Sequence, residues 1–446
     1  MSDSSLPLLF PAVAGRSVEC RFDGGDVTSD AGVLLLREAD QRTCITDSLA
    51  LGIEDRRQRG KVAHTVIEMV RARVLAIACG YEDANDLDTL GSDPALKIAC
   101  ERLPATDGSL ASQPTISRLE NAVGRADLYR MGVALARRVV AQLPSETKRV
   151  ILDVDATDDP CHGQQEFEGF NGYYDEHCYL PFGVWVTDED GRMYLLASVL
   201  RPGKAGATLG LFGVLRRAVA LLRQRFPDVQ ITLRGDSAYG VADVIAFCEK
   251  QNLHYVLGLR GNSRLQVLST PAQMRACLRW REEGDGCREF DEFLYKAGSW
   301  SGKHRVVVKA QITRGDLNPR YVVTSHPEGT PEEVYAFYCR RGECENRIKE
   351  LKLDMQSGRT SCHRFLANQF RLLLHSAACV LMGVVQKALV GTRLEKAQAG
   401  TLRLRLLKIG ARVVQTCRRI WLHLPTSCPV KDLWRHVAAN LAFAAT

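Results

Sequence analysis

The stretch VQITLRGDSAYGVADVIAFCEKQNLHYVLGLRG, residues 229–261, decides the class of fold. It begins with a β-branched run that ends in a turn, continues with apolar residues at helical spacing, and closes with a second apolar run. Upstream, RVILDVDAT (149–157) predicts another strand, and PFGVWVTDEDGRMYLLASVLRPG (181–203) predicts a hairpin around an Asp-Gly turn. With a helix expected at about 208–225, the order of strands and helices indicates an α/β core.

The segments around this core have different patterns. Residues 29 to about 145 carry apolar side chains at helical spacing, whereas HRVVVKAQITRG and RYVVTSH return to strand-like runs. We therefore expect an inserted β-rich subdomain before a last core helix that begins near Pro331. The predicted regions are a helical region at 1–145, the first part of the core at 146–261, the β-rich insertion at 262–328, the closing helix at 329–360 and a basic helical region at 361–446.

Composition is that of a soluble globular protein, with 46% hydrophobic and 25% charged residues and a net charge of +7. The fifteen cysteines are scattered and form no CxxC pair, so a reducing cytoplasm fits better than a disulfide framework. The N-terminal residues do not resemble a signal peptide. The most apolar stretch, Leu372 to Val390, is interrupted by polar residues and predicts a buried helix, so no membrane span is expected.

The segment YCRRGECENRIKELK, residues 338–352, predicts a helix with one polar face. At roughly 100° per residue, four side chains fall within about 60° of one another: Tyr338, Arg341, Glu345 and Lys352. An adjoining apolar stripe allows the helix to pack on a sheet, while Glu343 and Glu350 point away. Geometry alone favours a solvated charged face over a catalytic one.

Acidic residues follow two of the expected strands. Asp155 ends the apolar run 150–155, with Asp153 on the same side of that strand by alternation, and Asp236 follows the strand at 229–235. An aspartate at a strand end can equally cap a turn, and Asp236 can start a short helix. Arg234 can neutralise a nearby phosphate or serve as a structural partner of an acidic loop.

A resemblance to a known family favours the functional interpretation of these acidic and basic residues over the structural one. The spacing Y-x2-R-x3-E-x6-K over 338–352 matches the Y-R-E-K signature of a branch of insertion-sequence DDE transposases. The chain also resembles the "thirteen-eighty" group of that superfamily, from about residue 20 to 435, through LDVDATDDPCHGQQ, FNGYYDEHCYLPFGVW, LRGDSAYG, ANQFRLLLHSAA and TLRLRLLKIGARVV. The resemblance implies an RNase H-like nuclease core with a β insertion and helical flanks that bind DNA ends.

The resemblance also implies the roles of individual residues. Two Mg²⁺ or Mn²⁺ ions would be held by Asp155, which matches the family's D-x-T motif, and by Asp236 and Glu345. Asp153 is the rival for the first position. Arg341 and Lys352 would hold the phosphate of the cleaved strand, and Tyr338 would position that strand or pack against Glu345.

Two further segments are candidates for contacts with DNA. Residues 112–119 resemble a recognition helix, although a plain capped surface helix fits as well; the candidates there are Gln113, Thr115, Ser117 and Arg118. The second segment is an arginine-rich C-terminal helix whose alternative is a solvated helix; its candidates are Arg403, Arg405, Lys408 and Arg412.

The sequence thus predicts a transposase that cleaves double-stranded DNA at the terminal inverted repeats of an insertion sequence and joins the freed 3′-hydroxyl to target DNA. We expect a homodimer on DNA and a cytoplasmic, nucleoid-associated protein. The alternatives are an RNase H-like nuclease without strand transfer and a transposase-derived DNA-binding protein without catalysis. All three carboxylates are present, which counts against the last.

Overall fold

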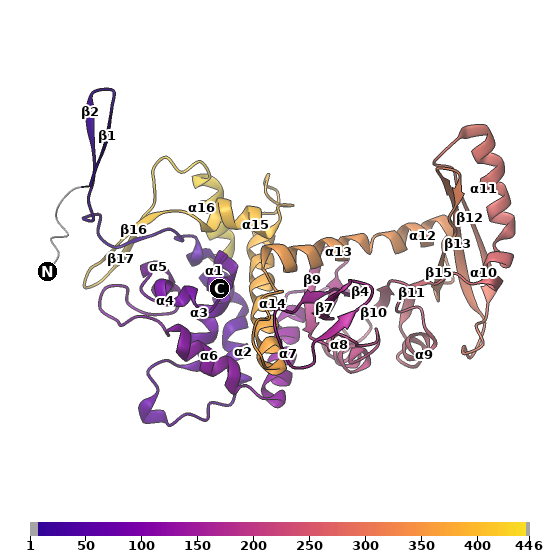
Figure 1. Cartoon of the computed structure of the whole chain (residues 1–446), viewed down its shortest axis with the longest axis horizontal. Helices are drawn as coiled ribbons and strands as arrows, with labels where there is room; N and C mark the ends of the chain where they lie inside the picture. Colours follow the sequence, from indigo (N-terminus) through magenta and orange to yellow (C-terminus); the bar gives the residue numbers. More distant parts are fainter. Residues whose placement is uncertain (1–7, 443–446) are drawn as a thin grey trace. The chain divides into compact units, whose positions relative to one another are not determined.

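The computed structural model of the protein describes residues 8–442 and divides into two compact units (Figure 1). Unit 1 combines the N-terminal residues up to Ala122 with the C-terminal residues from Ala377 onward. Unit 2 comprises Val123–Ser376 and contains the expected α/β core. Helix α7 therefore belongs to unit 2, where it packs against α8 and β9.

Unit 2 is built on a nine-stranded mixed sheet in the order β12-β13-β15-β11-β10-β4-β8-β9, with β14 paired to β13. The strands of unit 2 are β4 (Arg149–Ala156), β5 (Asp159–Pro160), β6 (Gly169–Asn171), β7 (Glu176–Tyr179), β8 (Phe182–Thr187), β9 (Met193–Val199), β10 (Gln230–Gly235), β11 (His254–Leu259), β12 (Arg288–Tyr295), β13 (His304–Thr313), β14 (Asp316–Leu317) and β15 (Arg320–Thr324). Its helices are α7 (Arg125–Val140), α8 (Leu211–Arg225), α9 (Ala242–Lys250), α10 (Ser263–Leu268), α11 (Thr270–Glu283), α12 (Pro331–Cys339), α13 (Gly342–Lys349) and the π-helix η2 (Glu350–Asp354).

The centre of this sheet is parallel. β10 lies between β4 and β11 and pairs in parallel with both, while β8 and β15 pair antiparallel with β4 and β11. The middle of β4 and nearly all of β10 are buried, as is usual for parallel strands covered on both faces. The strand expected at 149–157 and the two strands expected within 229–261 therefore meet in one sheet.

The expected β-rich insertion differs from the structure in two ways. Residues 263–283 form the helices α10 and α11, and β12, β13 and β15 extend the main sheet through the pairing of β15 with β11. The sequence pattern missed α11 because only two small residues, Ala272 and Ala276, are buried on it, so its apolar periodicity is weak.

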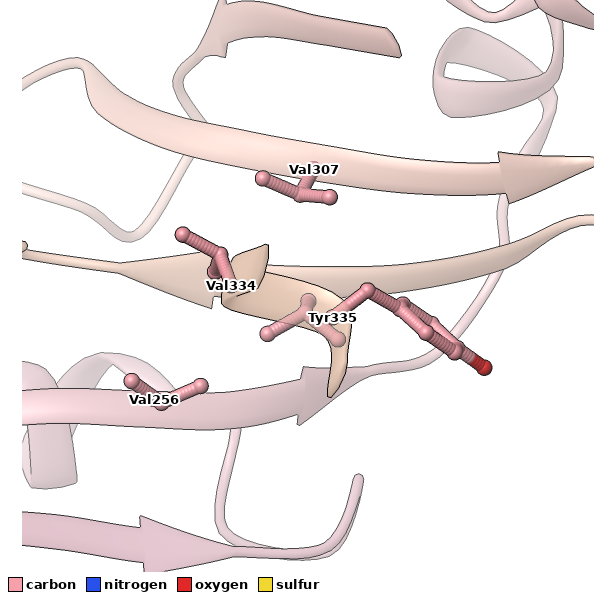
Figure 2. Packing of buried hydrophobic residues seen from close by; sticks show 5 residues of the cluster. Val256, Val307, Val334 and Tyr335 are labelled. Carbon is pink, nitrogen blue, oxygen red and sulfur yellow. The ribbon is translucent and has the colours of Figure 1, made fainter. Parts of the chain in front are cut away.

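Helix α12 packs on the extended part of the sheet. Val334 and Tyr335 contact Val256, Val307 and Val322 from three adjacent strands (Figure 2). Helix α11 packs on β12 and β13, and its Arg275 pairs with Glu289 of β12. The next residue of β12, Phe290, packs instead against the cluster formed by Val334 and Tyr335 of α12 and the three valines. Because alternate residues of a strand face opposite sides, α11 and α12 cover opposite faces of this part of the sheet.

Unit 1 is mainly helical. Its elements are β1 (Leu8–Val13), β2 (Arg16–Cys20), β3 (Val27–Thr28), α1 (Val33–Thr43), α2 (Ile45–Leu51), the 3₁₀-helix η1 (Arg59–Lys61), α3 (Val66–Cys79), α4 (Asp86–Leu90), α5 (Pro94–Ala99), α6 (Gln113–Ala122), α15 (Ala399–Leu402), the π-helix η3 (Arg403–Leu407), β16 (Ala411–Gln415), β17 (Ile420–His423) and α16 (Lys431–Ala442). Strand β16 lies between β17 and the N-terminal β3, so the two ends of the chain share one small sheet.

The prediction that Arg403, Arg405, Lys408 and Arg412 lie on one basic helix is wrong, although helices α14 and α16 do lie in the C-terminal region. Residues 403–407 form a π-helical turn, and residues 411–415 form strand β16. Ala411 and Val413 are buried while Arg412 is exposed, and the backbone of β16 pairs with strands on both sides. Pairing with the neighbouring β17 and with the distant β3 outweighs a local helical preference there.

Helix α14 (Phe365–Lys387) contains the apolar stretch noted in the sequence. Among the described residues it alone is long and apolar enough to cross a membrane, but 78% of its apolar window is buried inside the protein. It therefore has the character of a core helix, and no membrane span is indicated.

Candidate active site

Asp155 and Asp236 lie side by side at one edge of the sheet. The parallel register pairs Val154 of β4 with Gly235, the last residue of β10. Asp155 and Asp236 are the next residues along the chain. Adjacent strands are about 4.8 Å apart, so the two side chains start from neighbouring positions. The carboxyl ends of parallel strands are a common location for functional groups in α/β proteins.

The electrostatics of Asp155 reflect this proximity. Burial raises the pKa of Asp155 to about 6, and the negative charge of Asp236 contributes in the same direction. The Arg341 guanidinium acts against both effects. Two carboxylates that lie close together and partly buried repel each other unless a positive charge compensates them. A pair of this kind is typical of a cation-binding site.

The expected closing helix is interrupted. α12 ends at Cys339, α13 begins at Gly342, and the last turn is the π-helix η2. Figure 1 shows α12 and α13 following one another from the β12–β13 part of the sheet toward β4, and α13 contacts β4. A π-turn adds a residue to the helical repeat, so the face calculated for an uninterrupted helix does not continue through residue 352.

Three of the four signature residues are nevertheless brought together. Arg341 bridges Asp155 and Glu345, with its guanidinium 3.4 Å from the Asp155 carboxylate and 2.8 Å from that of Glu345. It also lies 5.8 Å from the centre of the Tyr338 ring. Burial raises the pKa of Tyr338. A Cβ atom on Gly258 would lie 2.6 Å from the Tyr338 hydroxyl and 3.0 Å from the Asp236 carbonyl carbon, so the hydroxyl lies close to the turn that carries Asp236.

Lys352 instead contacts the loop that follows β4. Its ammonium lies 2.9 Å from both carboxylate oxygens of Asp158. Burial alone would raise the pKa of Asp158, but the hydrogen bond and charge of Lys352 outweigh it and lower the pKa. Of the two glutamates expected to point away, Glu343 is exposed, whereas Glu350 is buried and pairs with Arg347.

The rival first ligand, Asp153, has a structural partner. Its buried carboxylate receives two hydrogen bonds from the buried Arg234 guanidinium, at 2.5 and 2.9 Å. Arg234 also donates to the carbonyl oxygen of Phe337 at 2.8 Å. Of the two roles considered for Arg234, the structure therefore shows the structural one, and Asp153 is engaged inside the sheet.

Gly258 is a site residue that the sequence analysis did not single out. A Cβ atom at this position of β11 would lie 2.6 Å from the Tyr338 hydroxyl and 2.8 Å from the backbone nitrogen of Ser237. Only glycine lets the turn after β10 and Tyr338 approach β11 so closely. The available indication was a glycine inside an apolar strand, in HYVLGLRG.

The first set of DNA-binding candidates lies on α6 of unit 1. Ile116 and Leu119 face the core, and Arg118 is exposed and donates to the Thr115 hydroxyl at 3.0 Å. Gln113 and Ser117 are partly exposed. The helix thus has one buried face and one polar face, which fits both readings considered for it.

The second set divides into two pairs. Arg403 and Lys408 are partly buried and hold unit 1 together: Arg403 donates to the carbonyl of Ala78 at 2.9 Å, and Lys408 lies 2.7 Å from the buried Asp30. Arg405 and Arg412 are exposed. Only the second pair is available to a polyanion without breaking contacts in the core.

The donor chemistry of the site suits divalent cations, although the side chains are not arranged around one. Within residues 8–442 no three His, Cys, Asp or Glu side chains are placed to hold a metal ion. Asp155, Asp236 and Glu345 offer the carboxylate oxygens that Mg²⁺ and Mn²⁺ prefer. Arg341 now supplies the positive charge that Asp155 and Glu345 share.

The fold and this pair of carboxylates define an α/β protein with an acidic site at the carboxyl edge of its parallel strands. Over residues 10–446 the sequence matches the family described as Transposase DDE domain group 1. The match covers nearly the whole chain, which therefore belongs to this transposase family. A search of the curated proteins found no match.

Proposed function

We propose that this protein cleaves DNA at the ends of an insertion sequence and joins those ends to target DNA. The observation that carries the proposal is that Asp155 lies beside Asp236 at the ends of two neighbouring strands, and that Arg341 bridges Asp155 to Glu345 of helix α13. Membership in a DDE transposase family supports it. The RNase H-like character of the core and the assignment to the "thirteen-eighty" group with its Y-R-E-K signature belong to the same proposal.

In this proposal Asp155, Asp236 and Glu345 would hold two divalent ions, which would supply the positive charge that activates the attacking oxygen and stabilises the leaving oxygen of an in-line displacement. Glu345 turns from Arg341 toward the two aspartates, and its side chain is 45% exposed, so the turn needs no repacking. Arg341 is then free to pair with the phosphate being cleaved. Tyr338, packed against Arg341, positions that strand.

The same arrangement accounts for the role proposed for Lys352. Asp158 holds the Lys352 ammonium with both of its carboxylate oxygens, in the loop that follows Asp155. A DNA phosphate replaces Asp158 as the partner of Lys352 when the end of the element binds. Two ends must be brought together for joining, so a homodimer on double-stranded DNA is part of the proposal.

The experiment is metal-dependent cleavage of a duplex that carries the inverted repeat bordering the gene. The test variants Asp155→Asn, Asp236→Asn and Glu345→Gln keep side-chain size and remove one charge each. Cleavage should fall by about three orders of magnitude or more, since the charge stabilisation supplied by the ions is worth several kcal/mol. The matched control is Glu343→Gln on the exposed side of the same helix, which should cleave like the parent.

Binding of the same duplex in EDTA separates chemistry from recognition. The three test variants should bind as tightly as the parent or more tightly, because each removes a negative charge that repels the phosphate. Equal cleavage by Glu345→Gln and the parent would contradict the assignment. Cleavage by the parent without joining to target DNA would favour the nuclease alternative.

A further inference from the structure

The two faces of the extended sheet differ in how their basic residues are compensated. On the α11 face, Arg275 pairs with Glu289 and Asp291, and Arg279 pairs with Glu283 and Glu289. The charges of Arg275 and Arg279 are therefore compensated by neighbouring carboxylates, so these two arginines add little net positive charge to the α11 face.

The α12 face is different. Lys309 of β13 stands directly opposite Arg320 of β15 and Phe290 of β12, and Arg288 is two residues along from Phe290 on the same side of β12. Arg288 and Arg320 are exposed, and in the described part of the chain no carboxylate forms an ion pair with any of the three basic residues.

Nearby acidic side chains are already engaged. Glu292, the acidic residue of β12 on this face, pairs with Arg305 at the opposite end, where α12 begins. Within residues 8–442 the hydrogen-bond partner of the Lys309 ammonium is the Gln311 side-chain oxygen, at 2.8 Å. Burial lowers the pKa of Lys309, and the like charges of Arg288 and Arg320 lower it further, so the three cations are close enough to repel one another.

The cluster of Arg288, Lys309 and Arg320 is connected to the candidate active site by the last turn of α12. Lys309 lies 5.2 Å from the centre of the Tyr335 ring, and the Tyr335 and Tyr338 rings are 5.9 Å apart. Tyr338 in turn packs against Arg341. A bound chain that extends from the candidate active site along this turn therefore reaches the cluster of Arg288, Lys309 and Arg320.

We propose that Arg288, Lys309 and Arg320 bind the phosphodiester backbone of the double-stranded DNA whose end lies in the active site. The inference rests on the proposed function and adds a surface to it. Uncompensated cations at this spacing suit an extended polyanion, because binding releases counterions and relieves the repulsion among the cations. Such contacts position the duplex and read no bases, so they act on DNA of any sequence.

The test is the salt dependence of binding to a random-sequence duplex, measured by fluorescence anisotropy in EDTA. The variant is Arg288→Gln/Arg320→Gln, and the control is Arg275→Gln/Arg279→Gln, which removes the same formal charge from the opposite face. Two lost phosphate contacts should lower the slope of log affinity against log salt by about 1.8, whereas the control slope should stay that of the parent. The charge-retaining Arg288→Lys/Arg320→Lys variant should keep the parental slope.

The outcomes separate this surface from the proposed function. A parental slope in Arg288→Gln/Arg320→Gln, or an equal decrease in both glutamine variants, would overturn the cluster while leaving metal-dependent cleavage untouched. A parent protein whose affinity for the duplex does not depend on salt would also overturn the cluster, whereas a parent that fails to cleave the element-end duplex with metal would overturn the proposed function. A decrease confined to Arg288→Gln/Arg320→Gln, restored by lysine, supports the cluster.

Discussion

At the scale of single residues, the loop after β4 holds two adjacent carboxylates in opposite environments. Asp158 is partly exposed and paired with Lys352, which lowers its pKa. Asp159 is 2% exposed, and burial raises its pKa to about 7 despite a hydrogen bond from Thr360. Its second carboxylate oxygen is buried without a hydrogen-bond partner.

These environments give opposite dependences of stability on pH. The folded protein keeps the Asp159 proton up to about pH 7, whereas the unfolded chain loses it near its ordinary pKa of about 4, so Asp159 destabilises the fold as pH rises through that window. Asp159→Asn should therefore raise the free energy of unfolding by roughly 1–3 kcal/mol at about pH 8, and the gain should vanish near pH 4. Denaturant titrations over this pH range measure it.

Asp158→Asn is the matched comparison one residue away. The pKa of Asp158 is lowered in the folded state, so its contribution is present at neutral pH and is lost as pH falls through that lowered pKa. We expect a cost of about 1 kcal/mol at neutral pH that disappears in acid. A gain from Asp159→Asn that stayed constant across the pH range would contradict the burial explanation.

At the scale of elements, the buried pair of Asp153 and Arg234 ties β4 and β10 to the end of α12. Arg234 contacts Asp153 inside the sheet and the Phe337 carbonyl at the start of the turn that carries Tyr338 and Arg341. The pair thus fixes where the helix segment stands over the strand ends. Its role in the site is to position other residues.

Arg234→Gln should destabilise the protein by about 3–5 kcal/mol, because it leaves the Asp153 charge buried and unpaired. Asp153→Leu/Arg234→Met replaces both charges with apolar side chains and should recover most of that stability. Cleavage should stay low in the double variant, since Phe337 has lost its donor and α12 its anchor. Thermal melts and cleavage rates of the two variants measure this, and parental cleavage by the double variant would show that the anchor is dispensable.

At the scale of the whole molecule, unit 1 contains both the N-terminal and the C-terminal segments of the chain. Some of its basic residues form contacts in the core, and others are exposed. Lys408 pairs with Asp30 and lies 3.8 Å from the centre of the Tyr81 ring, whereas Arg405 and Arg412 are exposed. The segment 403–412 is therefore part core and part surface, although its composition is uniformly basic.

This division predicts different effects of mutation. Arg405→Gln/Arg412→Gln should lower the salt slope of DNA binding and leave the melting temperature unchanged. Lys408→Gln should leave the slope unchanged and destabilise the protein by roughly 1–3 kcal/mol, because Asp30 loses its cationic partner and keeps the hydrogen bonds from the Ser29 and Tyr81 hydroxyls. Calorimetry and salt-dependent anisotropy of both variants test it. A lower slope in Lys408→Gln without destabilisation would assign Lys408 to the DNA-binding surface.

The sequence by itself determined the α/β class, the strand ends that carry Asp155 and Asp236, and the helix segment that carries Glu345. These features depend on apolar runs and turn residues that are only a few positions apart in the sequence. Local sequence patterns were therefore sufficient to predict them. The family resemblance agrees with the transposase family that the chain matches. The ligand assignments and the DNA-contacting residues stay predictions.

Only the tertiary structure decided the features that depend on residues far apart in the sequence. Asp153 and Asp155 share one side of the same strand, and the difference between them comes from Arg234, 81 residues from Asp153. Helix α11, which packs on β12 and β13, and the strand at Arg412, which pairs with β3, likewise depend on distant segments. The π-helical turn that contains Lys352 also has no counterpart in the sequence pattern. The tertiary structure also decides which lysines are paired with a carboxylate. Lys408 pairs with Asp30, whereas in the described part of the chain Lys309 stands opposite Arg320 and forms no ion pair, and the local sequence around a lysine does not reveal which case applies.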